Sequence, residues 1–338
     1  MSSSGILAEH VSKIYAMRKR QSFLRSTREE KIAVHDLSFR LPCGQVTGLL
    51  GLNGAGKTTT IKMLSTLLLP TSGHITIDGL DITRHTRTIR KRINMIAGGE
   101  RMVYWRLTGR ENLWYFAQLY DVESRTLKAR IDHLLKLVGL EDAADMVVER
   151  YSKGMKQRLQ IARGLINDPS YLFMDEPTIG LDAPIARELR QMVRRLAEDG
   201  KGVLLTSHYL KEVEELCAHI YVIDHGTLIA QGSPDELKAL TRQDRVVRIL
   251  LSEFSPAVKQ ALQDILQETG ARLVQDVQEE GISLTVSHPE DLSARVAATV
   301  ALNGGSMLKL EVIEPTLEDA MLVLAGTSQA KEFADVTK

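Results

Sequence analysis

The glycine-rich segment Gly51–Thr58 restricts the fold of this chain more than any other sequence feature. Its residues read Gly-Leu-Asn-Gly-Ala-Gly-Lys-Thr and fit the pattern G-x-x-x-x-G-K-[ST]. The apolar run Val46–Leu50 precedes it as a predicted strand, and a helix is predicted to begin at Lys57. Gly54 and Gly56 let the backbone approach a polyphosphate, to which the start of the helix presents its N–H groups. The segment therefore predicts an α/β domain with a phosphate-binding loop.

Two adjacent carboxylates, Asp175 and Glu176, follow the apolar run Leu172–Met174. Taken alone, such a pair is most often a solvated strand end. Beside a phosphate-binding loop it predicts a nucleotide hydrolase, in which Asp175 holds Mg²⁺ and Glu176 polarises the attacking water. In the loop itself, we expect Lys57 to reach the β- and γ-phosphates and Thr58 to bind Mg²⁺.

Short apolar runs alternate with amphipathic stretches from Val46 onward, and this alternation predicts a mainly parallel sheet covered by helices. The expected strands are Val46–Leu50, Tyr171–Met174 and Val203–Thr206, followed by helices from Lys57, Ala183 and Leu210. Between about Thr86 and Leu165 apolar residues recur at helical spacing, which predicts a helical subdomain inserted into the sheet domain. We therefore assign residues 1–240 to a nucleotide-binding domain, with its helical subdomain at about 86–165.

A second domain is predicted after the polar segment Ser233–Asp244, where the rhythm of the sequence changes. The expected elements are strand Val246–Leu251, helix Ala257–Glu268, strands Arg272–Val277 and Ile282–Ser287, helix Glu290–Leu302 and strand Met307–Ile313. This β-α-β-β-α-β order is the ferredoxin-like split unit. We assign residues 245–326 to a small α+β accessory domain and residues 327–338 to a frayed tail.

The composition narrows the possible partners. The chain holds 43 basic and 43 acidic residues, so no overall field attracts it to nucleic acid, and no nucleic-acid partner is expected. Cys43 and Cys217 have neither the spacing of a metal site nor that of a disulfide framework. No apolar run reaches the roughly 18 residues of a membrane-spanning helix, and the first residues lack the pattern of a signal peptide. Work at a membrane would therefore need a partner.

One segment, residues 18–31, is strongly basic. Its basic residues, opposed only by Glu29 and Glu30, are Arg18, Lys19, Arg20, Arg25, Arg28 and Lys31. One interpretation is a solvated loop. The other is a contact with lipid headgroups or with an acidic partner surface.

Three further motifs resemble those of ATP-binding-cassette (ABC) ATPases. Tyr151–Arg158 resembles the ABC signature, Gly180–Asp182 the D-loop and Thr206–His208 the switch-histidine motif, and their order and spacing match the family through residues 1 to about 235. The resemblance implies ATP and Mg²⁺ as cofactors, and an active form in which two copies sandwich ATP head to tail. It also implies a separate transmembrane permease, which would hold this cytoplasmic protein at the inner face of the cell membrane.

The resemblance also implies roles for individual residues. The expected ATP contacts are Tyr15, Gly51, Asn53, Gly54, Ala55, Gly56, Lys57, Thr58 and Thr59. Tyr15 would stack on adenine, although a lone tyrosine is more often a packed core residue. The residues expected to face the γ-phosphate bound by the opposite copy are Ser152, Lys153, Gly154 and Met155. Ser152 is equally suited to cap the helix that follows it, and both interpretations can hold.

The expected catalytic residues are Glu176, Lys57 and His208, with His208 as a γ-phosphate contact. The alternatives are a packed interior histidine at His208 and a simple helix cap at the D-loop residue Asp182. The glutamine usual in the family's Q-loop is missing, because its place falls on Gly99, followed by Glu100. Glu100 is then either a metal-shell or water contact, or a solvated loop glutamate.

The second domain resembles the accessory domain of drug- and antibiotic-resistance exporter ATPases, and Glu314–Asp319 matches their closing motif. This resemblance favours export. We expect the permease to contact the segment Gly98–Trp105, where Met102, Val103, Tyr104 and Trp105 would form an apolar surface, unless they pack inside the subdomain.

The main alternative is a soluble ABC ATPase acting on the ribosome or on nucleic acid. Ribosome-acting relatives usually carry two cassettes, whereas this chain has one Lys57-type loop, and the spacing from Lys57 to Ser152 leaves no room for the coiled coils of DNA-repair relatives. A nucleotide sensor without hydrolysis is a further alternative, against which the intact Asp175, Glu176 and His208 argue.

Overall fold

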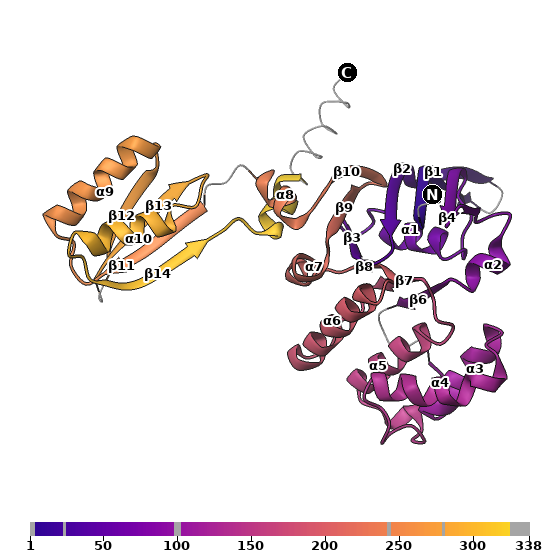
Figure 1. Cartoon of the computed structure of the whole chain (residues 1–338). Coiled ribbons are helices and arrows are strands. Elements are labelled where there is room, and N and C mark those ends of the chain that lie inside the picture. Colours follow the sequence, from indigo (N-terminus) through magenta and orange to yellow (C-terminus); the bar gives the residue numbers. More distant parts are fainter. Residues whose placement is uncertain (1–3, 23–24, 98–102, 242–244, 279–280, 325–338) are drawn as a thin grey trace. The chain divides into compact units, whose positions relative to one another are not determined.

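The computed structural model describes residues 4–22, 25–97, 103–241, 245–278 and 281–324 (Figure 1). Within these residues the chain divides into two compact units between Pro234 and Asp235. No helix of the described residues is long and apolar enough to cross a membrane.

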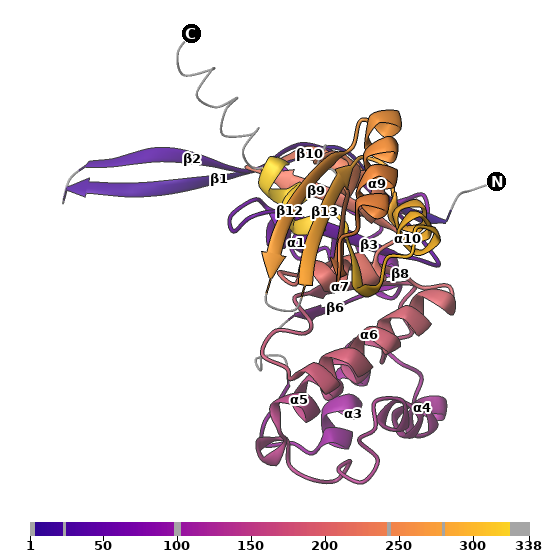
Figure 2. The same ribbon diagram turned by 90° about the vertical axis from the view of Figure 1, so that its left-hand side faces the viewer.

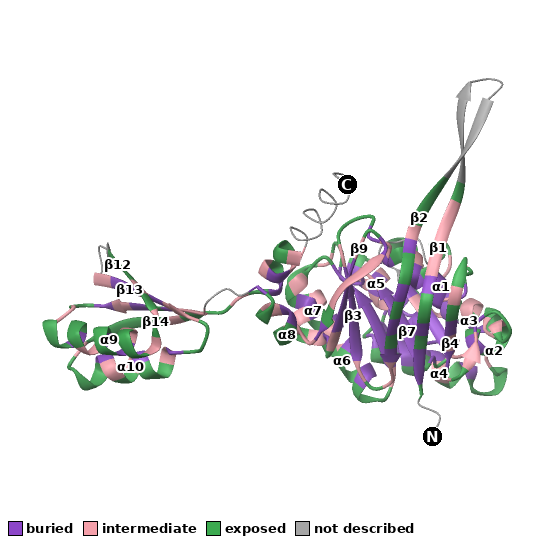
Figure 3. Cartoon of the chain, turned by 90° about the horizontal axis from the view of Figure 1, so that it is seen from above, coloured by how far each residue is buried: buried purple, intermediate pink, exposed green. Residues whose placement is uncertain are grey.

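A six-stranded sheet forms the centre of the first unit, in the order β10-β9-β3-β8-β7-β6. Its strands are β3 (Val46–Leu50), β6 (Ile93–Ala97), β7 (Tyr171–Asp175), β8 (Gly202–Thr206), β9 (His219–Asp224) and β10 (Thr227–Gly232). All neighbours pair in parallel except β9 and β10. The strands β3 and β7 are almost wholly buried, as is typical of parallel strands covered on both faces (Figure 3). The predicted parallel sheet is confirmed.

The helices of the first unit pack on this sheet or gather beside it. They are α1 (Lys57–Leu64), α2 (Thr86–Arg90), α3 (Gly109–Leu119), α4 (Ser124–Leu137), the 3₁₀ turn η2 (Val148–Arg150), α5 (Lys153–Gly164), α6 (Ala183–Glu198) and α7 (Leu210–Leu216). The helices α3, α4 and α5 lie together at one end of the unit, away from α1 (Figures 1 and 2). They form the helical part that the sequence predicts.

The expected start of the helical subdomain near Thr86 is wrong. The short helix α2 is followed by β6, which pairs in parallel with β7 and belongs to the central sheet. Ile93 and Ile96 of β6 are buried, and the Asn94 side chain donates to Asn167 at 2.7 Å. A run of five residues is too short for its periodicity to distinguish a buried strand from a helix. The helical part begins only at Gly109.

A second, antiparallel sheet has the order β2-β1-β4-β5. Its strands are β1 (Gly5–Ser22), β2 (Arg25–Pro42), β4 (Ser72–Ile77) and β5 (Leu80–Asp81). One core cluster contains side chains of both sheets and of α1, among them Ile6, Ile61 and Phe173. The start of α1, and with it the glycine-rich loop, is therefore fixed by packing against both sheets.

The interpretation of residues 18–31 as a loop is wrong for the backbone. The strand β1 pairs with β4 only as far as Ser12, but it continues to pair with β2 through Ser22. The two strands thus extend from the sheet as an antiparallel ribbon, which Figure 2 shows projecting from the unit. Most residues of this segment are basic or polar and show no apolar stripe at helical spacing, so nothing in the sequence drives a helix here.

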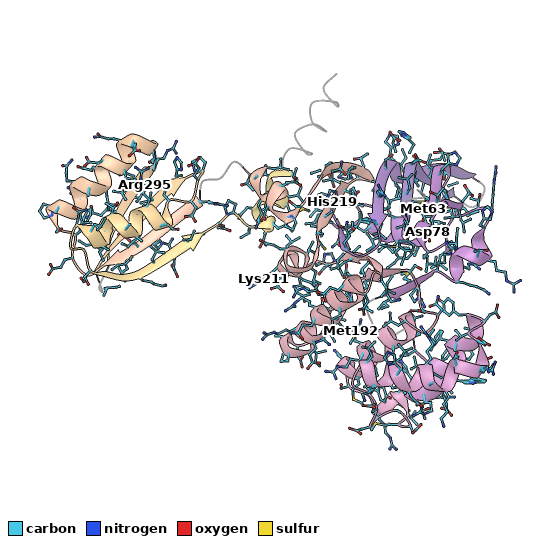
Figure 4. All side chains as sticks on the ribbon, in the orientation of Figure 1. Met63, Asp78, Met192, Lys211, His219 and Arg295 are labelled. Carbon is cyan, nitrogen blue, oxygen red and sulfur yellow. The ribbon has the colours of Figure 1, made fainter. Side chains whose placement is uncertain are left out.

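The second unit contains the helix α8 and a four-stranded antiparallel sheet in the order β12-β13-β11-β14. Its elements are α8 (Pro234–Ala239), β11 (Arg245–Leu251), α9 (Pro256–Thr269), β12 (Arg272–Gln278), β13 (Gly281–His288), α10 (Ser293–Leu302) and β14 (Met307–Ile313). This topology confirms the predicted ferredoxin-like unit. The helices α9 and α10 share a core with the sheet, and Arg295 of α10 forms an ion pair with Glu268 of α9 (Figure 4).

Candidate nucleotide site

The glycine-rich loop adopts a backbone that only glycine accommodates at two of its positions. Gly56 has φ +105°, and a Cβ added to it would lie 2.5 Å from the Ala33 carbonyl oxygen. At Gly51, where φ is +156°, an added Cβ would lie 2.2 Å from the Ile223 carbonyl oxygen. Strand β2 and the end of β9 therefore press on the loop from outside. These two strands keep the glycine-rich loop folded around the first N–H groups of α1, which can stabilise an anion.

The ammonium of Lys57 lies inside the glycine-rich loop. Its Nζ donates to the carbonyl oxygens of Gly51 at 2.6 Å and Leu52 at 3.2 Å. Burial lowers the pKa of Lys57 below the ordinary value of a lysine, and the negative charges of Glu176 and Asp175 oppose this shift. A polyphosphate would offer the buried ammonium stronger acceptors than these carbonyls, because charge-assisted hydrogen bonds are the stronger kind.

Hydroxyl and carboxylate oxygens meet beside the loop. Thr58 Oγ1 donates to Asp175 Oδ2 at 3.4 Å, and Thr206 Oγ1 donates to Asp175 Oδ1 at 2.6 Å. Thr206 thereby fixes the carboxylate and leaves its second oxygen directed at Thr58. These are all hard oxygen donors, and a Mg²⁺ ion prefers one or two of them together with water and phosphate oxygens. Thr58 and Asp175 therefore fit a magnesium ion.

Glu176 follows Asp175 in a left-handed backbone conformation, with φ +54°. Its backbone N–H donates to the Thr206 carbonyl at 3.0 Å, so β8 holds this uncommon conformation in place. His208 Nε2 lies 2.6 Å from Glu176 Oε1. The histidine thus contacts the carboxylate predicted to polarise water, and its side chain is half exposed rather than packed in the interior.

The buried residue Glu212 is a member of the site that the sequence did not suggest. Its Oε2 accepts from Ser207 Oγ at 2.7 Å and from Thr178 Oγ1 at 2.8 Å, and Ser207 Oγ in turn accepts from the Tyr209 N–H at 3.0 Å. The first turn of α7 thereby joins the segment that carries His208 to the segment after Glu176. An acidic residue in the first turn of a helix is normally read as a solvated or dipole-stabilising charge, so only the fold shows its buried position.

One cavity, of about 270 Å³, gathers most of the predicted nucleotide contacts. Its lining residues are Tyr15, Lys31, Ala33, Asn53, Gly54, Ala55, Gly56, Lys57, Thr58, Thr59 and Glu176. The Tyr15 ring lies on β1 beside Lys31 of β2, with Lys13 Nζ 5.7 Å from the ring centroid. Tyr15 is partly buried among the lining residues of this cavity and not a core residue.

None of the signature residues, all within the described part of the chain, lines the cavity at Lys57. Ser152 Oγ accepts from the Met155 N–H at 3.2 Å, which confirms the predicted helix cap of α5. Lys153 lines a small cavity with Gly180 and Leu181 of the D-loop. Asp182 caps α6 by accepting from the Ile185 N–H at 3.1 Å.

Helix α5 packs closely at Gly154 against α6, the helix that follows the D-loop. A Cβ added to Gly154 would lie 2.4 Å from Ile185 Cδ1. The signature and the D-loop therefore form one surface, which lies apart from the Lys57 loop within a single chain (Figure 1).

The Q-loop position, Gly99 and Glu100, lies outside the described residues, as does Met102. Of the two alternatives for this segment, Val103 follows internal packing and not the apolar surface, because it is only 7% exposed. Tyr104 and Trp105 are each 48% exposed. Tyr104 stacks edge-on against Tyr115 with ring centroids 4.9 Å apart, and Lys156 Nζ lies 5.0 Å from the Trp105 ring centroid.

A glycine-rich phosphate loop, a strand ending in two carboxylates, and a histidine against the second carboxylate define a nucleotide-hydrolysing cassette. Comparison with known proteins agrees with this class. The family model described as ABC transporter matches residues 34–179. A solved structure described as the ATP binding subunit of an ABC transporter is similar in fold, with a TM-score of 0.59 and 27% identity over 70% of this chain and 93% of that one.

Curated relatives extend over both units. A daunorubicin resistance ATP-binding protein of Streptomyces coeruleorubidus is 37% identical over 306 residues, which cover 90% of this chain and 95% of the relative. The Nod factor export ATP-binding protein I of Rhizobium sp. (strain N33) is 35% identical over 302 residues, 89% of this chain and 95% of the relative. The ABC transporter ATP-binding protein NatA of Bacillus subtilis is 39% identical over 222 residues, 66% of this chain and 90% of the relative. The chain belongs to the ATP-binding proteins of ABC transporters, and it is an ABC-type ATPase.

Proposed function

We propose that this chain is the motor subunit of an exporter: two copies close over two MgATP molecules and thereby drive a separate transmembrane permease. The relatives named for drug resistance and for Nod factor export support the export direction. The permease would hold the chain at the inner face of the membrane, since no described helix of the chain can span it.

One observation carries the two-copy cycle. The cavity at Lys57 has no lining residue from Ser152–Met155 among the described residues, although the family resemblance gives both segments a role at phosphate. Ser152 caps the N-terminus of the twelve-residue helix α5, whose positive end favours a negative charge in front of it. A second copy turned head to tail would bring that helix end to the open side of the Lys57 cavity. The composite site then exists only between two copies.

Six residues in and beside the cavity have definite tasks in this cycle. Lys57 binds the β- and γ-phosphates, and Tyr15 stacks on adenine at the rim. Thr58 and Asp175 hold Mg²⁺, which when bound neutralises charge on the β- and γ-phosphate oxygens. Glu176 accepts a hydrogen bond from the attacking water, and His208 orients the Glu176 carboxylate and contacts the γ-phosphate. Hydrolysis transfers the γ-phosphoryl group to water, with ADP as the leaving group, and release of the inorganic phosphate removes the anion between the two copies, so they separate again.

A mixing experiment tests the composite site. Lys57→Ala disables the phosphate loop, and Ser152→Asp keeps the helix cap, because aspartate is a good capping residue, while placing a carboxylate against the γ-phosphate. We expect each variant alone to be inactive. In a mixed dimer one site combines the intact Lys57 of one copy with the intact Ser152 of the other, so the mixture should recover ATP hydrolysis. A mixture as inactive as its components would show that the site is formed within one copy.

The permease would dock on the exposed aromatic surface formed by Tyr104, Trp105 and Trp114. These side chains are each about half exposed, and Trp114 lines a cavity of about 440 Å³ between α3 and α4. An exposed apolar group of this kind is typical of a protein-binding surface.

A further inference from the structure

The strand β14, Met307–Ile313, forms one edge of the sheet in the second unit. Among the described strands it pairs only with β11, which leaves its other side without a neighbour in the sheet. The pairing places Leu310 opposite Ile249 and Val312 opposite Val247. Directly opposite residues share a face of a sheet, so Leu310 and Val312 lie on the face that carries the core.

These two side chains are nevertheless only partly covered. Ile249 and Val247 are fully buried beneath α9 and α10, whereas Leu310 remains 36% exposed and Val312 38% exposed. Leu308, which lies at an irregularity in the pairing, is 53% exposed. An exposed apolar edge strand readily pairs with another chain, and proteins usually protect such an edge with charges or a covering element.

The sequence of β14 is complementary to itself. Lys309 and Glu311 flank Leu310 on the opposite face of the strand, with side chains 62% and 41% exposed, and Lys309 Nζ lies 2.6 Å from Glu311 Oε1. If two copies of β14 pair in antiparallel fashion about Leu310, Lys309 of each copy lies opposite the partner's Glu311. Leu310 then meets its own counterpart on the face that carries the core. Opposite charges and apolar pairs directly across two strands are both stabilising.

Only this register satisfies both faces. A shift of one residue would place apolar residues opposite charged ones, because it moves every side chain to the other face. A shift of two residues would place Lys309 opposite the partner's Lys309, or Glu311 opposite the partner's Glu311, and like charges in direct opposition are destabilising. The strand therefore specifies one pairing with its own copy.

We propose that a second copy of this chain docks on β14 by antiparallel pairing centred on Leu310, which joins the two accessory sheets into one. This contact needs no nucleotide. The β14 contact would keep two ATPase units at high local concentration between cycles. This role rests on the proposed two-copy function. The pairing uses the β14 edge of both copies, so it closes at two copies.

Disulfide trapping in the full-length chain tests the register. Lys57→Ala serves as background and nucleotide is omitted, so that the ATP sandwich does not form. Leu310→Cys should give a disulfide-linked dimer on mild oxidation, because residue 310 faces itself at the two-fold axis. Val274→Cys, an exposed residue of the same sheet on the β12 edge, is the matched control and should stay monomeric. Trapping of both cysteines alike, or of neither, would overturn the proposal.

Charge exchange provides a second test that requires no oxidation. Light scattering should give the mass of a dimer for the nucleotide-free chain and of a monomer for Lys309→Glu, which sets two carboxylates against each other on both sides of Leu310. Lys309→Glu combined with Glu311→Lys restores opposite charges and should restore the dimer. A monomeric parent chain, or a dimer indifferent to the single charge reversal, would contradict the pairing. Neither result depends on ATP, so both are separate from the mixing experiment.

Discussion

The buried carboxylate of Glu212 offers a quantitative test of how the catalytic segments are positioned. It accepts hydrogen bonds from Ser207 and Thr178, and both donate to the same oxygen, Oε2. A hydrogen bond to a charged group contributes about 1.5–3 kcal/mol, and removing the side chain leaves two hydroxyls without this acceptor. Part of that loss is offset because a carboxylate no longer has to be buried. We expect Glu212→Ala to lower the free energy of unfolding by about 2–4 kcal/mol.

The effect on catalysis should fall on kcat. His208 follows Ser207 directly and lies 2.6 Å from Glu176, so a loosened Ser207 displaces the histidine from the carboxylate. A displacement of about 1 Å costs on the order of 10²-fold in rate. The hydrogen bonds of Glu212 go to Ser207 and Thr178 rather than to the Lys57 loop, so KM for ATP should change little. Steady-state ATP hydrolysis, measured with the proposed permease present, gives both kcat and KM.

Glu212→Gln is the matched control. Its amide oxygen has two lone pairs and can replace Oε2 as acceptor for both hydroxyls, so kcat should stay within a few-fold of wild type. Equal losses in Glu212→Gln and Glu212→Ala would assign the effect to charge and not to position. A destabilised Glu212→Ala with normal kcat would refute the positioning role.

Three further predictions concern the loop, its lysine and the docking surface. Gly56→Ala should abolish ATP binding in a titration and lower Tm, because an added Cβ would lie 2.5 Å from a backbone oxygen at φ +105°. Burial lowers the pKa of Lys57, and phosphate favours its charged form, so ATP affinity should fall as pH rises through that lowered pKa. Lys57→Arg, which stays charged, should lack this fall if it binds ATP, and parallel curves would contradict the assignment. Tyr104→Ala with Trp105→Ala should prevent co-purification with the permease, whereas Leu67→Ala, equally apolar and exposed elsewhere, should not.

Features that depend on a few consecutive residues could be predicted from the sequence. The phosphate loop and the cap at Ser152 are of this kind, because glycine spacing and capping chemistry are local. The ferredoxin-like unit could be predicted because each of its elements is long enough to show its own period.

Features that depend on distant contacts could not be predicted in the same way. The strand β6 falls within a stretch that the sequence predicts to be helical, because only its pairing with β7 decides its conformation. The sequence leaves a surface position and internal packing equally open for Val103, since an apolar residue in a short segment has no period that shows its face, and the structure buries it. The burial of Glu212 depends on Ser207 and Thr178 approaching from other segments of the fold.

The central claim is that Glu176-dependent ATP hydrolysis in this chain drives a membrane partner. The most direct measurement is the rate of ATP hydrolysis by the full chain, alone and with its co-purified permease, for wild type and for Glu176→Gln. We predict a rate that the permease stimulates and that falls by about 10²- to 10⁴-fold in Glu176→Gln, with ATP binding retained. A rate indifferent to any membrane protein, or one that survives Glu176→Gln, would contradict the account.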